Sequence, residues 1–198
     1  PNFTTRTTAI NTTPISAARI GITGGSDLTG IGRKLLPDRS GSTLKLGGVS
    51  GTLRGLSSPP PKKVSFGTEA ECNAAHDGPV YFDTALSSNG QLQNAFVWVK
   101  TGLEGYAFPT PTEEQIVDQR GCVYQPHVVG VQVGQPLTFV NSDATTHNVH
   151  TMPKKGRGAN FSMPRKGMRT TKTFKRPQVM MKTKCDIHPW MSAWIGVV

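Results

Sequence analysis

A short stretch near the end of the chain carries the residue types most able to hold a metal ion. Cys185, His188 and Met191 follow one another at three-residue intervals, and a further imidazole, His147, lies upstream. Two imidazoles, a thiolate and a distant thioether form the ligand set of a blue-copper electron-transfer site. The sulfur donors favour Cu(I), while the imidazoles suit both oxidation states. These four residues therefore predict one copper ion that can exchange an electron with little rearrangement.

The same residues could also serve one of three other roles: a zinc site, a binuclear copper centre or core packing. Zinc accepts Cys and His ligands, with water or another His completing a tetrahedron, but a zinc site does not need a methionine three residues after the histidine. A binuclear copper centre needs two cysteines in the ligand loop, and only Cys185 is there. In a purely structural role, Cys185 would be a small buried hydrophobe and Met191 a core residue. Four ligand types at matching spacing favour copper.

Two strands must position the ligand loop. Val179–Lys184 has strand-like alternation, so that Cys185 would end a strand, and Ser192–Val198 reads as the next one. His188 and Met191 would then lie in the turn between two antiparallel strands. A rigid turn of this kind suits a redox site.

The first imidazole and the rest of the chain fit the same architecture. His147 follows the strand-like run Pro136–Val140, so it can approach from a neighbouring strand end. The other strand-like runs are Gly48–Leu53, Lys63–Phe66, Ala95–Lys100, Gln115–Asp118, Val128–Val133 and Leu137–Asn141. Short runs separated by turn signals indicate an all-β sandwich. We expect Asn94–Lys100 to be its best-buried central strand and Thr68–His76 to hold the main helix.

Two motifs carry a resemblance to a known family. Thr146-His147-Asn148-Val149-His150, together with Cys185-x-x-His188-Pro189-x-Met191, resembles the cupredoxins. The ligand loop is most similar to that of the amicyanins, and the match covers roughly residues 132–198. More loosely, the layout from residue 49 onwards resembles bacterial plastocyanin-like and methylamine-utilisation-like proteins.

The resemblance implies a Greek-key β-sandwich with a type 1 copper site and electron transfer in place of substrate catalysis. His147, Cys185 and His188 would be the tight ligands, and Met191 the weak axial one. Asn148 would brace the ligand loop from outside the ligand set. The exposed edge of His188 would be the place where electrons leave.

The remaining histidines are expected to lie outside the metal site. His150 is three residues after His147, so in a strand it points to the opposite face. His127 lies at a strand entrance and fits a packing or hydrogen-bonding role. His76 follows Cys72 by four residues, a spacing that is only a weak indication of a metal pair.

Two cysteines remain once Cys185 is assigned to the metal. Cys72 and Cys122 could form a disulfide, which would close a loop of about 50 residues and stabilise the fold by roughly 4 kcal/mol in the chain-entropy model. They could instead bind a second metal together with His76, and spacing does not separate the two cases. Because disulfides persist outside the cytoplasm, the simpler reading agrees with a periplasmic or other extracytoplasmic protein.

The positive charge of the chain is concentrated in one segment, Thr151–Lys184. Its eleven cationic residues are Lys154, Lys155, Arg157, Arg165, Lys166, Arg169, Lys172, Lys175, Arg176, Lys182 and Lys184, and it has no Asp or Glu. The other residues carry 11 basic against 12 acidic side chains, so the net charge of +10 comes from this segment. We expect it to steer an acidic redox protein, such as a cytochrome or a membrane complex. No nucleic-acid-binding module accompanies it.

Composition divides the chain into two parts. Residues 1–44 are rich in Thr, Gly and Ser and poor in large apolar residues, which predicts an irregular N-terminal extension. Residues 45–198 are expected to form the sandwich domain. No stretch predicts a transmembrane helix. The extension and the basic segment together fit a subunit of a larger electron-transfer assembly.

Overall fold

A computed structural model of the protein describes residues 62–82, 87–88, 91–92, 94–100 and 108–198. The chain divides into two compact units, one made of residues 1–59 and 85–109, the other of residues 60–84 and 110–198. The predicted boundary between residues 44 and 45 and the predicted strand Gly48–Leu53 lie outside the described residues.

In the first unit, the described strands are β1 (Ser87–Ser88) and β2 (Gln91–Leu92), which pair antiparallel. The predicted strand Ala95–Lys100 is wrong, because residues 94–100 form no strand. Val97 is 42% exposed and Trp98 36% exposed, so this run is not a buried central strand either. An apolar run becomes a strand only where a neighbouring strand pairs with it, and here none of the described strands does.

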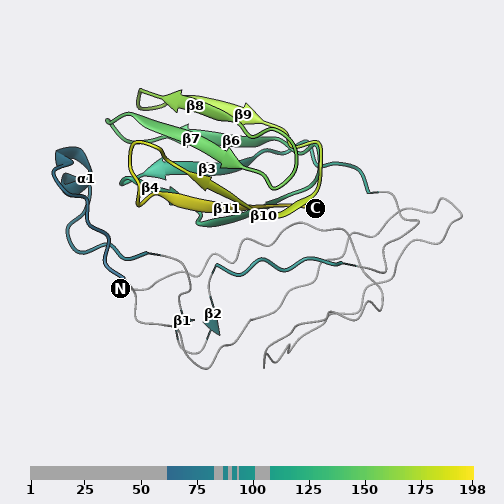
Figure 1. Cartoon of the computed structure of the whole chain (residues 1–198), viewed down its shortest axis with the longest axis horizontal. Coiled ribbons are helices and arrows are strands. Elements are labelled where there is room, and N and C mark those ends of the chain that lie inside the picture. The colour runs from purple at the N-terminus through teal and green to yellow at the C-terminus, as the bar shows by residue number, and fades with distance from the viewer. Residues whose placement is uncertain (1–61, 83–86, 89–90, 93, 101–107) are drawn as a thin grey trace, which may run out of the picture. The chain divides into compact units, whose positions relative to one another are not determined.

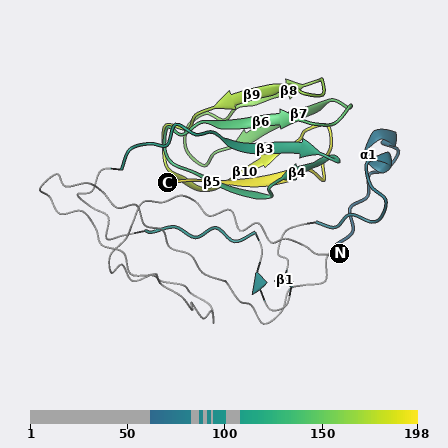
Figure 2. The same ribbon diagram turned by 180° about the vertical axis from the view of Figure 1, so that it is seen from behind.

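The second unit is a sandwich of two mixed sheets (Figures 1 and 2). One sheet has the order β5 (Val128–Val131), β11 (Ser192–Val197), β10 (Gln178–Lys184), β7 (His147–Met152) and β8 (Asn160–Met163). The other has the order β4 (Val123–Gln125), β3 (Gln115–Arg120), β6 (Leu137–Asn141) and β9 (Arg169–Lys172). The all-β sandwich predicted from the sequence is confirmed.

The core lies between the inner faces of the two sheets. Its central side chains are at most 2% exposed: Val117, Leu137 and Phe139 from one sheet, and Val149, Met181 and Ile195 from the other. In β10 the buried Met181 and Thr183 alternate with the exposed Lys182, as predicted. Burying each large apolar side chain contributes about 1.5–3 kcal/mol, so this packing holds the strand ends that carry the site.

Strand register brings the predicted ligand positions to one end of the sandwich. β7 and β10 are antiparallel neighbours, with His150 opposite Lys184. The beginning of β7 therefore lies beside the end of β10. β10 and β11 pair antiparallel up to Lys184 and Ser192, and residues 185–191 form the turn between them. The predicted hairpin around the ligand loop is confirmed.

A short segment, between the two stretches of chain that make up the first unit, belongs to the sandwich unit and lies at the same end. We call residues 62–82 the cap. Its helix α1 (Ala70–Ala74) is shorter than the predicted 68–76, and the predicted strand Lys63–Phe66 is reduced to a single bridge between Lys63 and Tyr81. α1 lies at the end of the sandwich where β3 stops and β4 begins (Figures 1 and 2). No helix among the described residues is long and apolar enough to cross a membrane.

Candidate metal centre

The four predicted ligands come from two places that the sheet brings together. His147 is the first residue of β7, while Cys185, His188 and Met191 occupy the turn that follows β10. All four are at most 1% exposed. The turn is closed by backbone hydrogen bonds: Cys185 N–H donates to the carbonyl of Met191 (3.2 Å), and Met191 N–H donates to that of His188 (3.0 Å).

The donor atoms of three of these residues converge. The Nδ1 atoms of His147 and His188 are 3.0 Å apart, and Cys185 Sγ is 3.8 Å from Nδ1 of His188. One donor atom from each of the three residues lies within 4.8 Å of the others. Metal–nitrogen and metal–sulfur bonds are about 2.0–2.3 Å long, so two such bonds can span either measured separation. A thiolate and two imidazoles also form the donor set that suits copper. The residues therefore fit the predicted ion.

Cys185 is held in the state that binds a metal. Its Sγ accepts the backbone N–H groups of Asn148 and His188, both at 3.4 Å. Burial would raise the pKa of the thiol, but hydrogen bonding to His147 and to these backbone donors outweighs burial and lowers the pKa. Since the thiolate is the metal-binding form of cysteine, the surroundings of Cys185 favour binding.

Asn148 braces the ligand loop, as the resemblance implied. Its Oδ1 accepts the backbone N–H of Asp186 at 2.6 Å, and its Nδ2 donates to Asn160 Oδ1 at 2.5 Å. Asp186 in turn binds His150 Nδ1 (2.9 Å) and Lys184 Nζ (2.8 Å) on the exposed side of the loop. His150 thus faces away from the converging donors, as predicted.

Asp143 is a residue of this site that sequence reasoning missed. Its carboxylate accepts the N–H groups of Gly121 (2.7 Å) and Cys122 (2.8 Å), and its Oδ2 lies 2.9 Å from His147 Nε2. Gly121 and Cys122 both have positive φ, +64° and +54°, so their successive N–H groups converge on one anion. The sequence shows that Asp143 lies four residues before His147. It does not show that the Gly121–Cys122 turn lies beside this carboxylate.

The surroundings of the two imidazoles shift their pKa values in opposite directions. Burial would lower the pKa of His147, but hydrogen bonds to Asp143 and Cys185 outweigh it and raise the pKa. Burial would raise the pKa of Asp143, yet His147 and the two backbone donors hold it below its ordinary value. The pKa of His188 is lowered, first by burial and then by the charge of His147. His147 is therefore oriented by a carboxylate, whereas His188 is kept neutral.

The two remaining cysteines form a disulfide, Cys72–Cys122. This removes the alternative of a second metal held by Cys72, His76 and Cys122. His76 instead stacks on Phe66, with ring centroids 5.2 Å apart, and its Nε2 is 2.7 Å from the carbonyl oxygen of Gly121. His127, buried just before β5, accepts the N–H of Trp194 through its backbone carbonyl.

The disulfide anchors the cap over His188, and here the expectation of an exposed edge is wrong. His188 is 0% exposed. Cys72 Sγ and Glu69 Oε2 each lie 4.0 Å from its Nε2, and the Trp190 ring packs against it at 5.2 Å between centroids. Trp190 Nε1–H also donates to the carbonyl of Cys122 (2.9 Å), which ties the ligand loop to the disulfide. The ligand motif gave no sign of this cover.

Comparison with solved structures finds copper proteins. A Cu(I) form of an amicyanin mutant is 26% identical and has a TM-score of 0.37; the match covers 42% of this chain and 80% of that one. A copper-containing nitrite reductase from Thermus scotoductus SA-01 is 27% identical with a TM-score of 0.38, over 48% of this chain and 24% of that one. No family model and no curated protein sequence matches the chain. These likenesses are partial, and the function proposed below rests on the site itself.

Proposed function

We propose that the chain is a mononuclear blue-copper electron-transfer protein. His147, Cys185 and His188 would hold the ion, and Met191 would be its weak axial ligand. The observation that carries the proposal is the convergence, within 4.8 Å, of a thiolate and an imidazole from the turn and a second imidazole from the start of β7, all of them buried. When bound, copper supplies one-electron chemistry between Cu(II) and Cu(I).

The protein's own residues prepare this site in three ways. Backbone N–H groups of Asn148 and His188 stabilise the thiolate of Cys185. Asp143 fixes the orientation of the His147 ring, and the closed turn fixes that of His188. Burial of all the ligands excludes water, so little rearrangement is needed when the charge of the centre changes by one.

We class the protein as an electron carrier and not as an enzyme. Catalytic metal sites keep an open coordination position for water or substrate. Four ligands leave no such position. The complete burial of His147 and His188 supports the same view, because no substrate can reach their donor atoms in this conformation.

A second candidate is a structural or copper-holding protein without redox turnover. The covered edge of His188 favours it, since a buried ligand restricts exchange with partners. The two candidates differ in a measurable property: a carrier is reduced and reoxidised rapidly with both states stable, whereas a holding protein keeps one state.

We place the protein outside the cytoplasm, in the periplasm or an equivalent compartment. The Cys72–Cys122 disulfide supports this placement because such bonds persist in oxidising surroundings. Its partner would be an acidic redox protein, steered by the basic segment Thr151–Lys184. A place as one subunit of a larger redox assembly agrees with these features.

Titration of the metal-free protein with Cu(I) and Cu(II) tests the proposed site. The proposal predicts tight binding of one ion per chain in both states, and loss of this binding in Cys185→Ala. His150→Ala is the matched control, because His150, in β7, contacts Asp186 on the exposed side of the ligand loop and its loss should leave the stoichiometry at one. Equal binding by the Cys185→Ala variant and the unmodified protein would contradict the site.

A further inference from the structure

The route by which cupredoxin-like sites were expected to exchange electrons is closed in this protein. The cap covers His188: Cys72 Sγ and Glu69 Oε2, which both belong to the cap, each lie 4.0 Å from its Nε2. A redox partner therefore needs another surface. This inference rests on the proposed electron-transfer function and asks where the partner binds.

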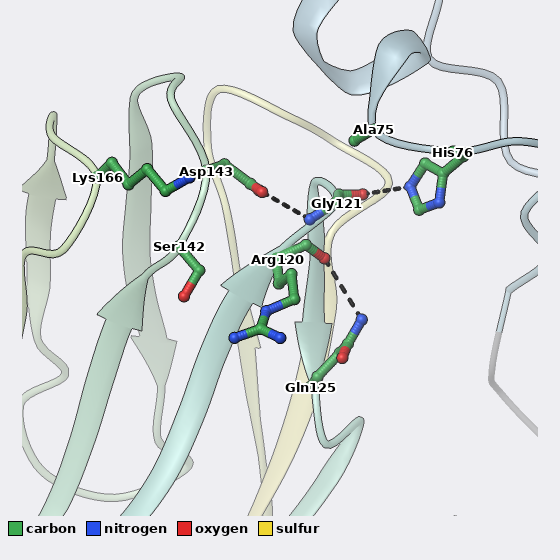
Figure 3. A pocket seen from close by; sticks show the side chains of 8 residues that line it. All are labelled: Ala75, His76, Arg120, Gly121, Gln125, Ser142, Asp143 and Lys166. Atoms are coloured by element: carbon green, nitrogen blue, oxygen red, sulfur yellow. Dashed lines mark hydrogen bonds between the residues drawn. The ribbon is translucent and has the colours of Figure 1, made fainter.

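A recess of about 580 Å³ opens at the seam between the cap and the sandwich (Figure 3). His76 lines it from the cap, and Arg120, Gly121, Asp143 and Lys166 line it from the loops at the end of the sandwich. Figure 3 shows these side chains arranged around the turn at Gly121, with the Lys166 side chain extending toward Asp143. The recess thus lies where the cap meets the candidate metal centre.

One wall of the recess is in direct contact with a ligand. Asp143 lines the recess, and its Oδ2 lies 2.9 Å from Nε2 of His147. A group bound in the recess is therefore separated from the metal centre by one carboxylate and one hydrogen bond. His147 provides a connection to the surface that does not pass through His188.

The recess favours an anion. Arg120 is 66% exposed in its side chain; it pairs with Asp118 at 3.1 Å but keeps most of its surface in solvent. Lys166 is exposed. The carboxylate of Asp143 is already engaged by Gly121 N–H, Cys122 N–H and His147, so its oxygens are turned to these groups. Two cations therefore stand at the mouth of the recess.

The basic segment reaches the metal centre at this place. After β8, whose Met163 pairs with His147, the chain turns through residues 164–168 against the loop that leads to His147; Gly167 N–H donates to the Asn141 carbonyl at 2.6 Å. Lys166 belongs to that turn. Lys154, in contrast, binds Gln178 at the opposite end of β10, about 20 Å away along a seven-residue strand. Lys166 is near the ligands and Lys154 is not.

We propose that this recess is the docking point for carboxylates of an acidic redox protein, and that electrons pass between that partner and the centre by way of Asp143 and His147. One electron moves in each encounter: the centre loses it as the partner gains it, or the reverse. No bond is made or broken.

The test uses hexacyanochromate(III), a redox-inert paramagnetic anion, as the probe of the surface. Added to the metal-free, isotope-labelled full chain, it should selectively broaden the amide signals of Gly121, Ser142 and Lys166. The double variant Arg120→Gln with Lys166→Gln should lose this broadening. The double variant Lys154→Gln with Lys155→Gln also removes two positive charges, but from the other end of the sandwich. This variant should keep the broadening. Broadening centred on Ile187 of the ligand loop, or equal losses in both variants, would overturn the proposal.

The copper-loaded protein separates this inference from the function on which it rests. With hexacyanoferrate(III) as oxidant at low salt, the recess variant should react about three- to tenfold more slowly than the Lys154 and Lys155 variant. Blue protein without broadening at the recess refutes the docking point alone. Broadening at the recess in a protein that takes up no copper refutes the proposed function and supports an anion-binding surface.

Discussion

At the scale of single residues, the surroundings of Cys185 distinguish this cysteine from an ordinary buried one. Two backbone N–H groups point at its sulfur, and two imidazoles lie beside it. Packing alone would not need those donors. The same closed turn buries Met191 to 1% exposure.

Replacing Met191 by Leu tests its axial role. We expect the variant to keep its blue colour, because the strong ligands are unchanged. The reduction potential should rise by roughly 60 mV or more, a tenfold shift of a one-electron equilibrium. Leu offers no donor in place of the thioether, and losing a ligand's electron pair destabilises the more highly charged Cu(II) more than Cu(I). Redox titration of both proteins measures the shift. An unchanged potential would mean that Met191 only fills space.

Asp143→Asn tests the carboxylate that holds His147. The pKa of Asp143 is lowered in the folded protein, so its contribution to stability is present above the unfolded value, near 3.8, and disappears as the pH falls through the folded value. The metal-free variant should lose roughly 1.5–3 kcal/mol at pH 7, the range for hydrogen bonds to charged groups. Urea unfolding at pH 7 and at about pH 2–3 should show the difference shrinking in acid. A constant difference at both pH values would argue against this role.

At the scale of elements, the cap and the Gly121–Cys122 turn together support the ligands. The turn binds Asp143, carries the disulfide to Cys72, and accepts the Trp190 indole N–H. A Cβ at Gly121 would lie 2.7 Å from the His76 ring, so only glycine allows the cap to approach this closely. Both imidazole ligands are therefore supported from the same turn.

Removing the disulfide should loosen the attachment of the cap to the Gly121–Cys122 turn. The double variant Cys72→Ser with Cys122→Ser opens a loop with a sequence separation of 50 residues and should cost about 4 kcal/mol of stability. In the metal-free protein, diethyl pyrocarbonate should then modify His188, which the cap protects in the unmodified chain. His150, whose side chain is 33% exposed, should react in both and serves as the control. Ready modification of His188 with the disulfide intact would show that the cap does not cover it. Phe66→Ala, which removes the contact with Trp190 but keeps the disulfide, offers a milder loosening.

Local patterns predicted the elements that surround the ligands. β6 has the predicted bounds, Leu137–Asn141, and β10 and β11 differ from prediction by one residue at one end. Each of these strands has either an alternating or a continuously apolar sequence, and each lies next to a clear turn. The Ala95–Lys100 prediction failed because its pattern is equally regular but none of the described strands pairs with it. Sequence alone does not reveal whether a partner strand exists.

At the scale of the whole molecule, charge is arranged along the sandwich. The basic segment reaches both ends of the sandwich: the turn at 164–168 lies by the ligands, and the turn holding Lys154 lies at the other end. Spacing was enough to group Cys185, His188 and Met191 as candidate ligands because the three share one loop. It could not predict the cover of His188, because Cys72 lies 116 residues away in the chain.

This arrangement predicts a salt-dependent reaction with anionic partners. Oxidation of the reduced protein by hexacyanoferrate(III) should slow by roughly tenfold between about 0.01 and 0.15 M ionic strength, as the screening length falls from about 30 to 8 Å. A cationic cobalt(III) phenanthroline complex should show the opposite trend. Stopped-flow rates give both, and identical salt effects for the two oxidants would exclude steering by the basic segment.

The most direct test of the central claim is the visible absorption spectrum of the oxidised protein, with metal content measured on the same sample. The account predicts an intense blue band from the Cys185 thiolate bound to Cu(II), one copper per chain, and neither in Cys185→Ala. A protein that stays colourless with added Cu(II), or a blue band that survives in Cys185→Ala, would contradict the assignment of this site.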